Sequence, residues 1–159
     1  GFMASLPALC GFVGGVLGGL LSDALLRAGW SLTAARKLPI IAGMLLSVSL
    51  ILCNYVDSEW LVVGLMALAF FGKGVGSLGW AVVADTAPRE VVGLAGSIFN
   101  MFGNTAGIVT PIVIGYIVDT TGSFNLALVF VGLNALVTVV AYTVVVGKIR
   151  RIEFQDAPA

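Results

Sequence analysis

The sequence contains no histidine, only two cysteines and few charged residues for its length. Without histidine the chain lacks the commonest general base and the commonest metal ligand of proteins. Cys10 and Cys53 stand in apolar stretches without C-x-x-C spacing, so we expect them to be packing residues. We therefore expect neither a metal site nor a cofactor, and the net charge of zero argues against a nucleic-acid partner.

Apolar residues are in excess instead. Hydrophobic residues make up 59% of the 159 residues and charged residues 10%, whereas soluble domains are nearer half apolar and a quarter charged. Such a chain folded in water would expose more apolar surface than a monomer tolerates. We predict an all-α integral membrane protein, because lipid offers no partner for backbone amides that a helix does not satisfy itself.

Five apolar stretches are long enough to cross ~30 Å of hydrocarbon as helices. We predict a transmembrane bundle over residues 1–147 and a polar, frayed tail over 148–159. The predicted spans are residues 2–21, 39–55, 60–84, 94–118 and 125–146.

Basic residues fall on one side of this bundle. The connections at the other side contain only acids, namely Asp57, Glu59 and Asp119. The positive-inside rule therefore predicts that the basic side, and with it the C-terminus, is cytoplasmic. Seven of the eight basic residues lie there: Arg27, Arg36, Lys37, Arg89, Lys148, Arg150 and Arg151.

Glycine recurs at helical spacing inside the spans. Small residues four apart let two membrane helices approach closely, so we expect these positions to be helix contacts. The repeats are Gly11, Gly15 and Gly19 with Gly14 and Gly18 beside them, then Gly72 and Gly76, then Gly103 and Gly107.

Lys73 is the eighth basic residue and lies inside the third span. It follows Trp60 by 13 residues, which places it ~20 Å along a helix, near the bilayer centre. A lysine at this depth costs ~2.5–3.5 kcal/mol, so it must face protein or a wet cavity. With Ser77 and Trp80 it would share one face of a continuous helix, as a cavity wall would. The alternative is a permanent ion pair with an acid outside this chain.

Asn100 and Asn104 form a second polar stripe in the fourth span. Two amides one turn apart can donate to and accept from a hydroxylated ligand. They can equally form hydrogen bonds between helices, and the sequence leaves this alternative open.

The connection after the first span carries a glycine, an aspartate four residues later, a second glycine and then an Arg-Lys pair, at Gly19, Asp23, Gly29, Arg36 and Lys37. This order resembles the signature loop of the major facilitator superfamily, which follows the second helix of each six-helix half. Ala24 departs from this pattern, since a basic residue usually follows the aspartate. The resemblance implies that the five spans are helices eight to twelve of twelve, and that the loop has a structural or gating role.

Further motifs lie in the third and fourth spans and the connection between them, namely Phe70–Gly74, Ser77, Trp80, Asp85–Pro88, Phe99–Asn100, Thr110–Pro111 and Gly115–Tyr116. Together they resemble the anion:cation symporter family, and within it the bacterial glucarate and galactarate transporters.

This resemblance implies proton-coupled import of a sugar acid across the bacterial inner membrane by alternating access. It implies that Ser77, Trp80 and Asn100 line the central site, to which Asn104 is a further candidate. Lys73 replaces a neutral amide of galactonate-type relatives, and our hypothesis is that it recognises the second carboxylate of a hexarate.

Three alternatives remain at this point. The chain could transport a monoacid such as galactonate, or form a structural or channel bundle in which Lys73 is permanently paired. A membrane-embedded enzyme would need a nucleophile–base pair or a metal cluster in the bilayer, and the sequence offers neither. Because the chain begins without an initiator methionine, we expect a fragment of a longer polypeptide. The resemblance implies that the coupling carboxylates lie in the missing half.

Overall fold

The computed structural model describes residues 2–153, and within that range the chain forms only helices and short connections. Five helical segments are long and apolar enough to cross a membrane, which confirms the predicted five-span all-α fold. These segments are Ser5–Arg27, Leu32–Tyr55, Glu59–Thr86, Arg89–Thr121 and Asn125–Val145.

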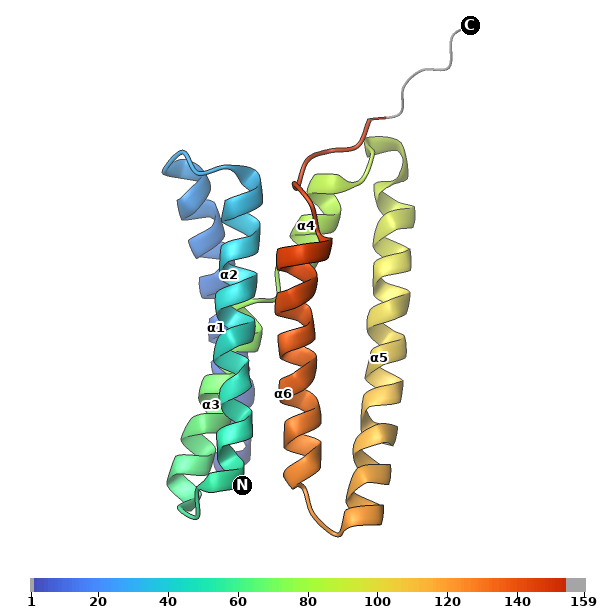
Figure 1. Cartoon of the computed structure of the whole chain (residues 1–159). Coiled ribbons are helices and arrows are strands. Elements are labelled where there is room, and N and C mark those ends of the chain that lie inside the picture. Colours follow the sequence, from blue (N-terminus) through green and yellow to red (C-terminus); the bar gives the residue numbers. More distant parts are fainter. Residues whose placement is uncertain (1, 154–159) are drawn as a thin grey trace, which may run out of the picture.

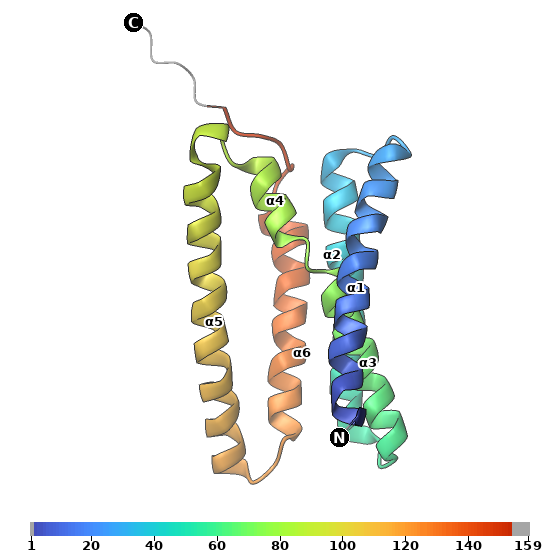
Figure 2. The same ribbon diagram turned by 180° about the vertical axis from the view of Figure 1, so that it is seen from behind.

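The helices form two groups that lie side by side (Figures 1 and 2). The first group is α1 (Phe2–Arg27), α2 (Leu32–Ser47) with the 3₁₀ extension η1 (Val48–Tyr55), and α3 (Glu59–Val75). The second is α4 (Gly79–Thr86), the short η2 (Arg89–Val91), α5 (Val92–Thr121) and α6 (Asn125–Val140), which continues as the π-helical turn η3 (Ala141–Val145). The α2 and η1 segments also contact α6, which joins the two groups.

Glycine allows the closest contact in the bundle, between α1 and α3. A Cβ atom at Gly18 would lie 2.8 Å from Val75 Cα, and one at Gly14 would lie 3.0 Å from the Phe71 carbonyl carbon. Gly11 also contacts α3, since an added Cβ would lie 3.4 Å from the Phe70 carbonyl oxygen, and Gly15 lies near Gly74; the expected contacts are therefore found except at Gly19, where an added Cβ would meet nothing within 4 Å in the described part of the chain. Spacing identifies small residues but not the rotation of a helix about its axis.

Two other expected glycine contacts differ from each other. Gly72 packs against Gly43 of α2, where an added Cβ would lie 2.6 Å from the Leu46 Cβ. In α5, Gly103 and Gly107 have no neighbour within 4 Å of an added Cβ among the described residues. The predicted packing role is therefore found in α3 but not in this part of α5.

The connection predicted over residues 22–38 is mostly helical. α1 continues to Arg27, and α2 begins at Leu32 because the Ser31 hydroxyl accepts the Ala34 N–H at 3.2 Å. Gly29 supplies the left-handed φ of +85° that the tight turn needs. The basic residues of this stretch consequently project from helices rather than a loop, Arg27 from α1 and Arg36 and Lys37 from α2.

The tail is ordered as far as residue 153, which corrects the expectation of a frayed segment. Residues 146–153 run over the ends of α2 and α4, and Ile149 is 4% exposed. The Ile152 N–H donates to the Thr86 carbonyl at 2.9 Å. The rest of the predicted tail, residues 154–159, lies outside the described residues.

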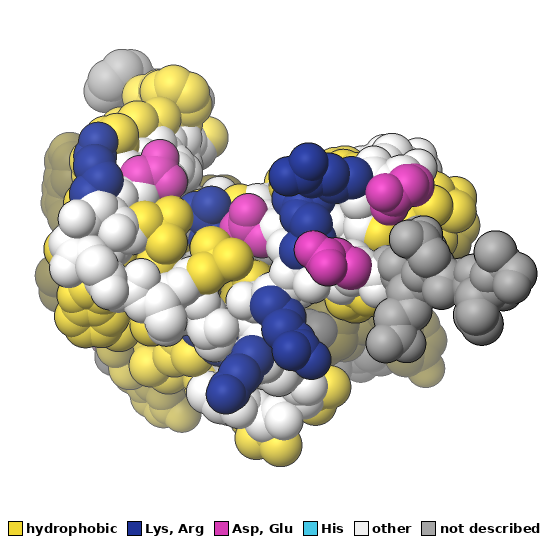
Figure 3. Space-filling view, turned by 90° about the horizontal axis from the view of Figure 1, so that it is seen from above, with side chains coloured by type: hydrophobic (Ala, Val, Ile, Leu, Met, Phe, Trp, Pro, Cys, Tyr) yellow, Lys and Arg dark blue, Asp and Glu magenta, His cyan; other side chains and the backbone are white. Residues whose placement is uncertain are grey.

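Lysine, arginine and acidic side chains gather on the end of the bundle where the tail lies (Figure 3). The α1–α2 turn and the α4–α5 connection lie at this same end (Figure 1). We call it the basic end.

Candidate functional site

The third membrane-crossing segment is broken near its middle. α3 ends at Val75 and α4 begins at Gly79, and between them the Ser77 N–H donates to the Gly74 carbonyl at 2.9 Å in a tighter turn. No side chain caps the start of α4, so its first N–H groups face the break without an intrahelical acceptor. The membrane span predicted over 60–84 is confirmed as Glu59–Thr86, but it is not one continuous helix, so the shared face inferred from helical periodicity does not hold across the break.

On one side of the break, Trp80 of α4 packs against α5. Its ring meets Phe99 edge to face, with centroids 5.1 Å apart and planes at 75°. A Cβ at Gly96 would lie 3.1 Å from the Trp80 ring, so only a small residue fits there. Asn100 directly follows Phe99, and Asn104 lies one turn further along α5; both are exposed. The structure thus brings Trp80 to the part of α5 that carries the predicted amides.

Ser77 lies in the break itself and is exposed. It faces α1, because a Cβ atom built on Gly15 would come 3.7 Å from the Ser77 hydroxyl oxygen. The break therefore places a hydroxyl beside α1 and an indole beside α5.

Lys73 lies apart from that group, in a cavity of about 370 Å³ between α2, α3 and α6. Its walls are mostly apolar, with three further polar side chains that the sequence did not single out. The lining residues are Met44, Ser47, Leu50, Ala69, Phe70, Lys73, Val131, Asn134, Ala135 and Thr138.

The charge of Lys73 has no partner among residues 2–153, where the structure gives it neither a hydrogen bond nor an ion pair. The acids of that range lie at or beyond the ends of the membrane-crossing segments: Asp23, Asp57, Glu59, Asp85, Glu90, Asp119 and Glu153. An unpaired ammonium is costly in an apolar setting, so the Lys73 charge calls for an anionic partner from outside residues 2–153.

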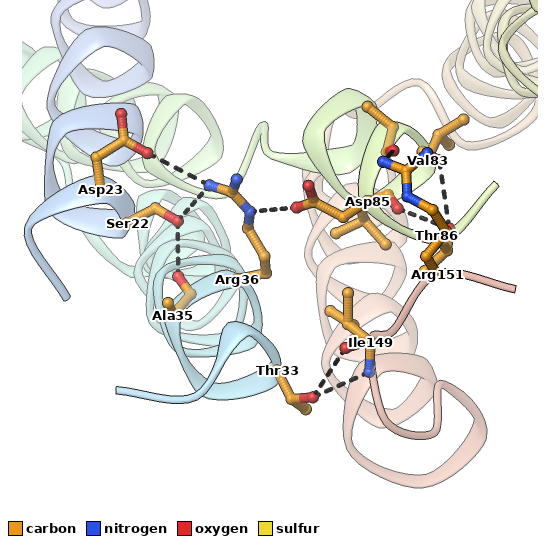
Figure 4. A network of polar contacts seen from close by, with 12 residues as sticks. Ser22, Asp23, Thr33, Ala35, Arg36, Val83, Asp85, Thr86, Ile149 and Arg151 are labelled. Carbon is orange, nitrogen blue, oxygen red and sulfur yellow. Dashed lines mark hydrogen bonds and ion pairs between the residues drawn. The ribbon is translucent and has the colours of Figure 1, made fainter. Parts of the chain in front are cut away.

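Arg36 organises the basic end (Figure 4). Its Nε donates to Asp85 Oδ2 at 2.7 Å, and its Nη1 donates to the Ser22 hydroxyl at 2.8 Å and lies 3.6 Å from Asp23 Oδ1. Ser22 is fully buried and donates in turn to the Ala35 carbonyl at 2.8 Å. One guanidinium thus connects α1, α2 and α4.

Lys37, the other basic residue of the signature loop, contacts the tail. Its ammonium donates to the Val146 carbonyl, and Thr33 one turn earlier accepts the Ile149 N–H at 3.0 Å. The signature loop singled out Asp23 and Arg36 but gave no sign of Asp85 as a partner of Arg36, although Asp85 offers the shorter contact. An acid at the end of an apolar span is the signal that could have identified it.

The helical arrangement agrees with comparison to known proteins. Residues 1–157 match the model of the Major Facilitator Superfamily. The chain belongs to that superfamily. It is accordingly a multi-pass membrane protein of a transporter family and not an enzyme.

Several known transporters are similar to this chain in sequence over nearly its whole length. The chain is 68% identical over 152 residues to a probable galactarate/D-glucarate transporter of Bacillus subtilis, covering 96% of this chain and 33% of the relative. It is 64% identical over 155 residues to a probable galactarate/D-glucarate transporter of Escherichia coli K12, covering 98% and 34%. A D-galactonate transporter of Escherichia coli is 42% identical over 152 residues, covering 96% and 35%. The chain spans about a third of the length of these relatives.

Proposed function

We propose that this chain is the C-terminal portion, helices eight to twelve, of a transporter that imports a sugar diacid such as galactarate or glucarate. The observation that carries the proposal is the identity of 64–68% over nearly the whole chain to probable galactarate/D-glucarate transporters. The lower identity of 42% to a D-galactonate transporter favours a diacid over a monoacid.

The proposed site lies around the break between α3 and α4, near the bilayer midplane, where such transporters bind substrate between their halves. Trp80 would cover the apolar face of the carbon chain, while Ser77, Asn100 and Asn104 would bind its hydroxyls and first carboxylate. Lys73 would bind the second carboxylate, which gives its otherwise unpaired charge a partner. Asp23, Arg36 and Lys37 would latch the basic end during alternating access.

Proton coupling is part of the proposal and rests on the family to which the chain belongs. The coupling carboxylates would lie in the other half of the transporter, because the acids of residues 2–153 lie at or beyond the ends of the membrane-crossing segments. We place the protein in the bacterial inner membrane with the C-terminus cytoplasmic, since seven of its eight basic residues lie at the basic end.

Uptake of labelled galactarate by cells that produce the full-length transporter, with and without a proton uncoupler, tests the proposal. We expect accumulation above that of empty cells, and its loss with the uncoupler. No accumulation of galactarate or glucarate would withdraw the substrate, while accumulation that resists the uncoupler would withdraw proton coupling.

The role of Lys73 is tested by Lys73→Asn in the full-length transporter. We expect diacid uptake to fall far more than monoacid uptake, because only the diacid offers a second carboxylate to the ammonium. An equal loss for both substrates would favour the structural alternative, a permanent ion pair with an acid elsewhere in the protein.

A further inference from the structure

Two aromatic residues interlock α4 with α5, each lying over a glycine of the other helix. Phe99 of α5 lies over Gly79, the first residue of α4, where an added Cβ would come 2.6 Å from Cζ at the tip of the Phe99 ring. Trp80 of α4 lies over Gly96, where an added Cβ would come 3.1 Å from the indole. Each glycine thus leaves the space that the ring of the opposite helix fills.

The two rings also contact each other. Their centroids are 5.1 Å apart and their planes meet at 75°. In this edge-to-face geometry aromatic pairs attract each other beyond the effect of the area they bury. Phe99 therefore contacts α4 twice, at Gly79 and at the Trp80 indole, and both contacts direct its ring toward α4.

The orientation of α4 depends on α5 because the break separates α4 from α3. No continuous helix crosses residues 76–78, and no side chain caps the start of α4. Among the helices of the described range, α5 is the one that α4 packs against most. The interlock lies at the first turn of α4, next to the break, so it fixes the end of the helix that carries Trp80.

Trp80 needs such a support, because packing within residues 2–153 covers only part of the indole. A partly exposed side chain can change between staggered rotamers, and a displaced binding group makes weaker contacts. The Phe99 ring lies against the indole, and Phe99 directly precedes Asn100 in α5. One side chain thereby relates the indole of α4 to the amide of α5, two groups of the proposed site.

We propose that Phe99 is a positioning residue of the sugar-acid site, which holds the Trp80 indole in the orientation that covers the substrate. This inference rests on the proposed function, and it assigns Phe99 no contact with the substrate. Phe99 and Trp80 are 37% and 54% exposed, so the pair stands at an open surface of this chain. A site between the two halves of a transporter requires such a surface.

Transport kinetics of the full-length protein give the first test. Phe99→Leu removes the ring but keeps an apolar side chain. It should raise the KM for galactarate about fivefold with little change in maximal rate, which is the order of one edge-to-face contact. Phe99→Met, which keeps more of the volume, should act in the same direction and replaces Phe99→Leu if thermal unfolding shows that variant to be unfolded. An unchanged KM in the folded variants would overturn the proposal.

Fluorine NMR of the purified full-length protein, labelled with a fluorinated tryptophan, reads the position of Trp80 independently of transport. The Trp80 signal is identified by its absence in Trp80→Phe. Phe99→Leu should shift and broaden this signal, because the indole loses a neighbouring ring and gains rotamers. The matched control is Phe102→Leu, the same substitution on the same helix at a residue 67% exposed, and it should leave the signal unchanged. A Trp80 signal that Phe99→Leu does not move would also overturn the proposal.

A double variant tests whether Gly79 and Phe99 act through one contact. Gly79→Ala should raise the KM for galactarate several-fold, because the new methyl group displaces the tip of the Phe99 ring. In a Phe99→Leu background the same change should add little, since the ring that it displaces is already gone. Fully additive effects of the two substitutions would contradict the interlock.

Failure of this inference can be told apart from failure of the proposed function. If the wild-type protein neither imports nor binds galactarate, the proposed function fails, and this inference fails with it. If the wild-type protein imports galactarate and Phe99→Leu moves the Trp80 signal but not the KM, the proposed function stands and Phe99 only packs α5 against α4.

Discussion

Arg36 of α2 donates a 2.7 Å hydrogen bond to Asp85 at the end of α4, joining residues 49 positions apart in the chain (Figure 4). Asp85 belongs to the segment that continues from the break, so this contact fixes the far end of α4 to the first helix group. The Arg36 and Asp85 side chains are 13% and 23% exposed, which shields the pair from solvent. A contact with this burial contributes more than an open surface ion pair.

Asp85→Asn should destabilise the protein by roughly 1–3 kcal/mol, because the guanidinium loses its charged acceptor while remaining largely buried. Thermal unfolding of the purified full-length transporter measures this effect. Glu90→Gln is the matched control, since Glu90 is an exposed acid close to Asp85 in the chain, without an ion pair among the described residues. Equal shifts for the two variants would contradict a specific role of the Arg36–Asp85 contact.

The close contact between α1 and α3 leads us to expect different effects on stability when two neighbouring glycines are replaced by alanine. Gly18→Ala should destabilise the protein by roughly 1–3 kcal/mol, because the new methyl group meets the Val75 backbone and forces the helices apart. Gly19→Ala should be neutral or slightly stabilising, since nothing lies within 4 Å of its Cβ in the described part of the chain. Thermal unfolding of both variants checks the contrast, and a Gly19→Ala variant at least as unstable as Gly18→Ala would refute this packing.

Span number and helical class followed from hydropathy because length and continuity of apolar runs are properties of the sequence itself. The rotation of α1 about its axis, which decides the face that contacts α3, could not be predicted from the sequence in the same way. The glycine pattern covered Gly11, Gly14, Gly15, Gly18 and Gly19, but it did not indicate that α3 lies closest at Gly14 and Gly18 and that Gly19 has no neighbour within 4 Å of an added Cβ in the described part of the chain. All five residues are small and adjacent, so only the position of the partner helix distinguishes them.

The candidate site could be predicted only in part. Lys73, Ser77 and Trp80 stood out as polar or aromatic residues in one apolar run, but the break at residues 76–78 lies within a single segment that is long and apolar enough to cross a membrane. Asn134 and Ser47 join Lys73 through tertiary contact between three helices distant in the chain. Local periodicity carries no information about such contacts.

The hydrogen bonds that hold the tail allow a prediction about amide hydrogen exchange in that segment. Thr33→Val removes the hydroxyl that accepts the Ile149 N–H at 3.0 Å, so amide hydrogen exchange in residues 149–152 should accelerate. Arg151, which donates to the Ala84 and Ala87 carbonyls at 3.0 and 3.3 Å, should still hold the segment near α4. Mass spectrometry of exchange in the full-length protein makes the measurement. Thr143→Val removes a hydroxyl that bonds only its own helix, and it should leave exchange in the tail unchanged.

Gly96 of α5 controls the position of Trp80 and therefore provides a test of the proposed substrate site that leaves the binding residues themselves intact. In Gly96→Ala the added methyl group would lie 3.1 Å from the Trp80 ring, which must shift by a few tenths of an ångström. If Trp80 covers the substrate, the KM for galactarate should rise several-fold with little change in thermal stability, because small misplacements of a binding group weaken its contacts. Gly93→Ala, one turn earlier on the same segment and without a neighbour within 4 Å of its added Cβ among the described residues, is the control and should transport normally. Normal transport kinetics in Gly96→Ala would place Trp80 outside the substrate site and reduce its role to packing between α4 and α5.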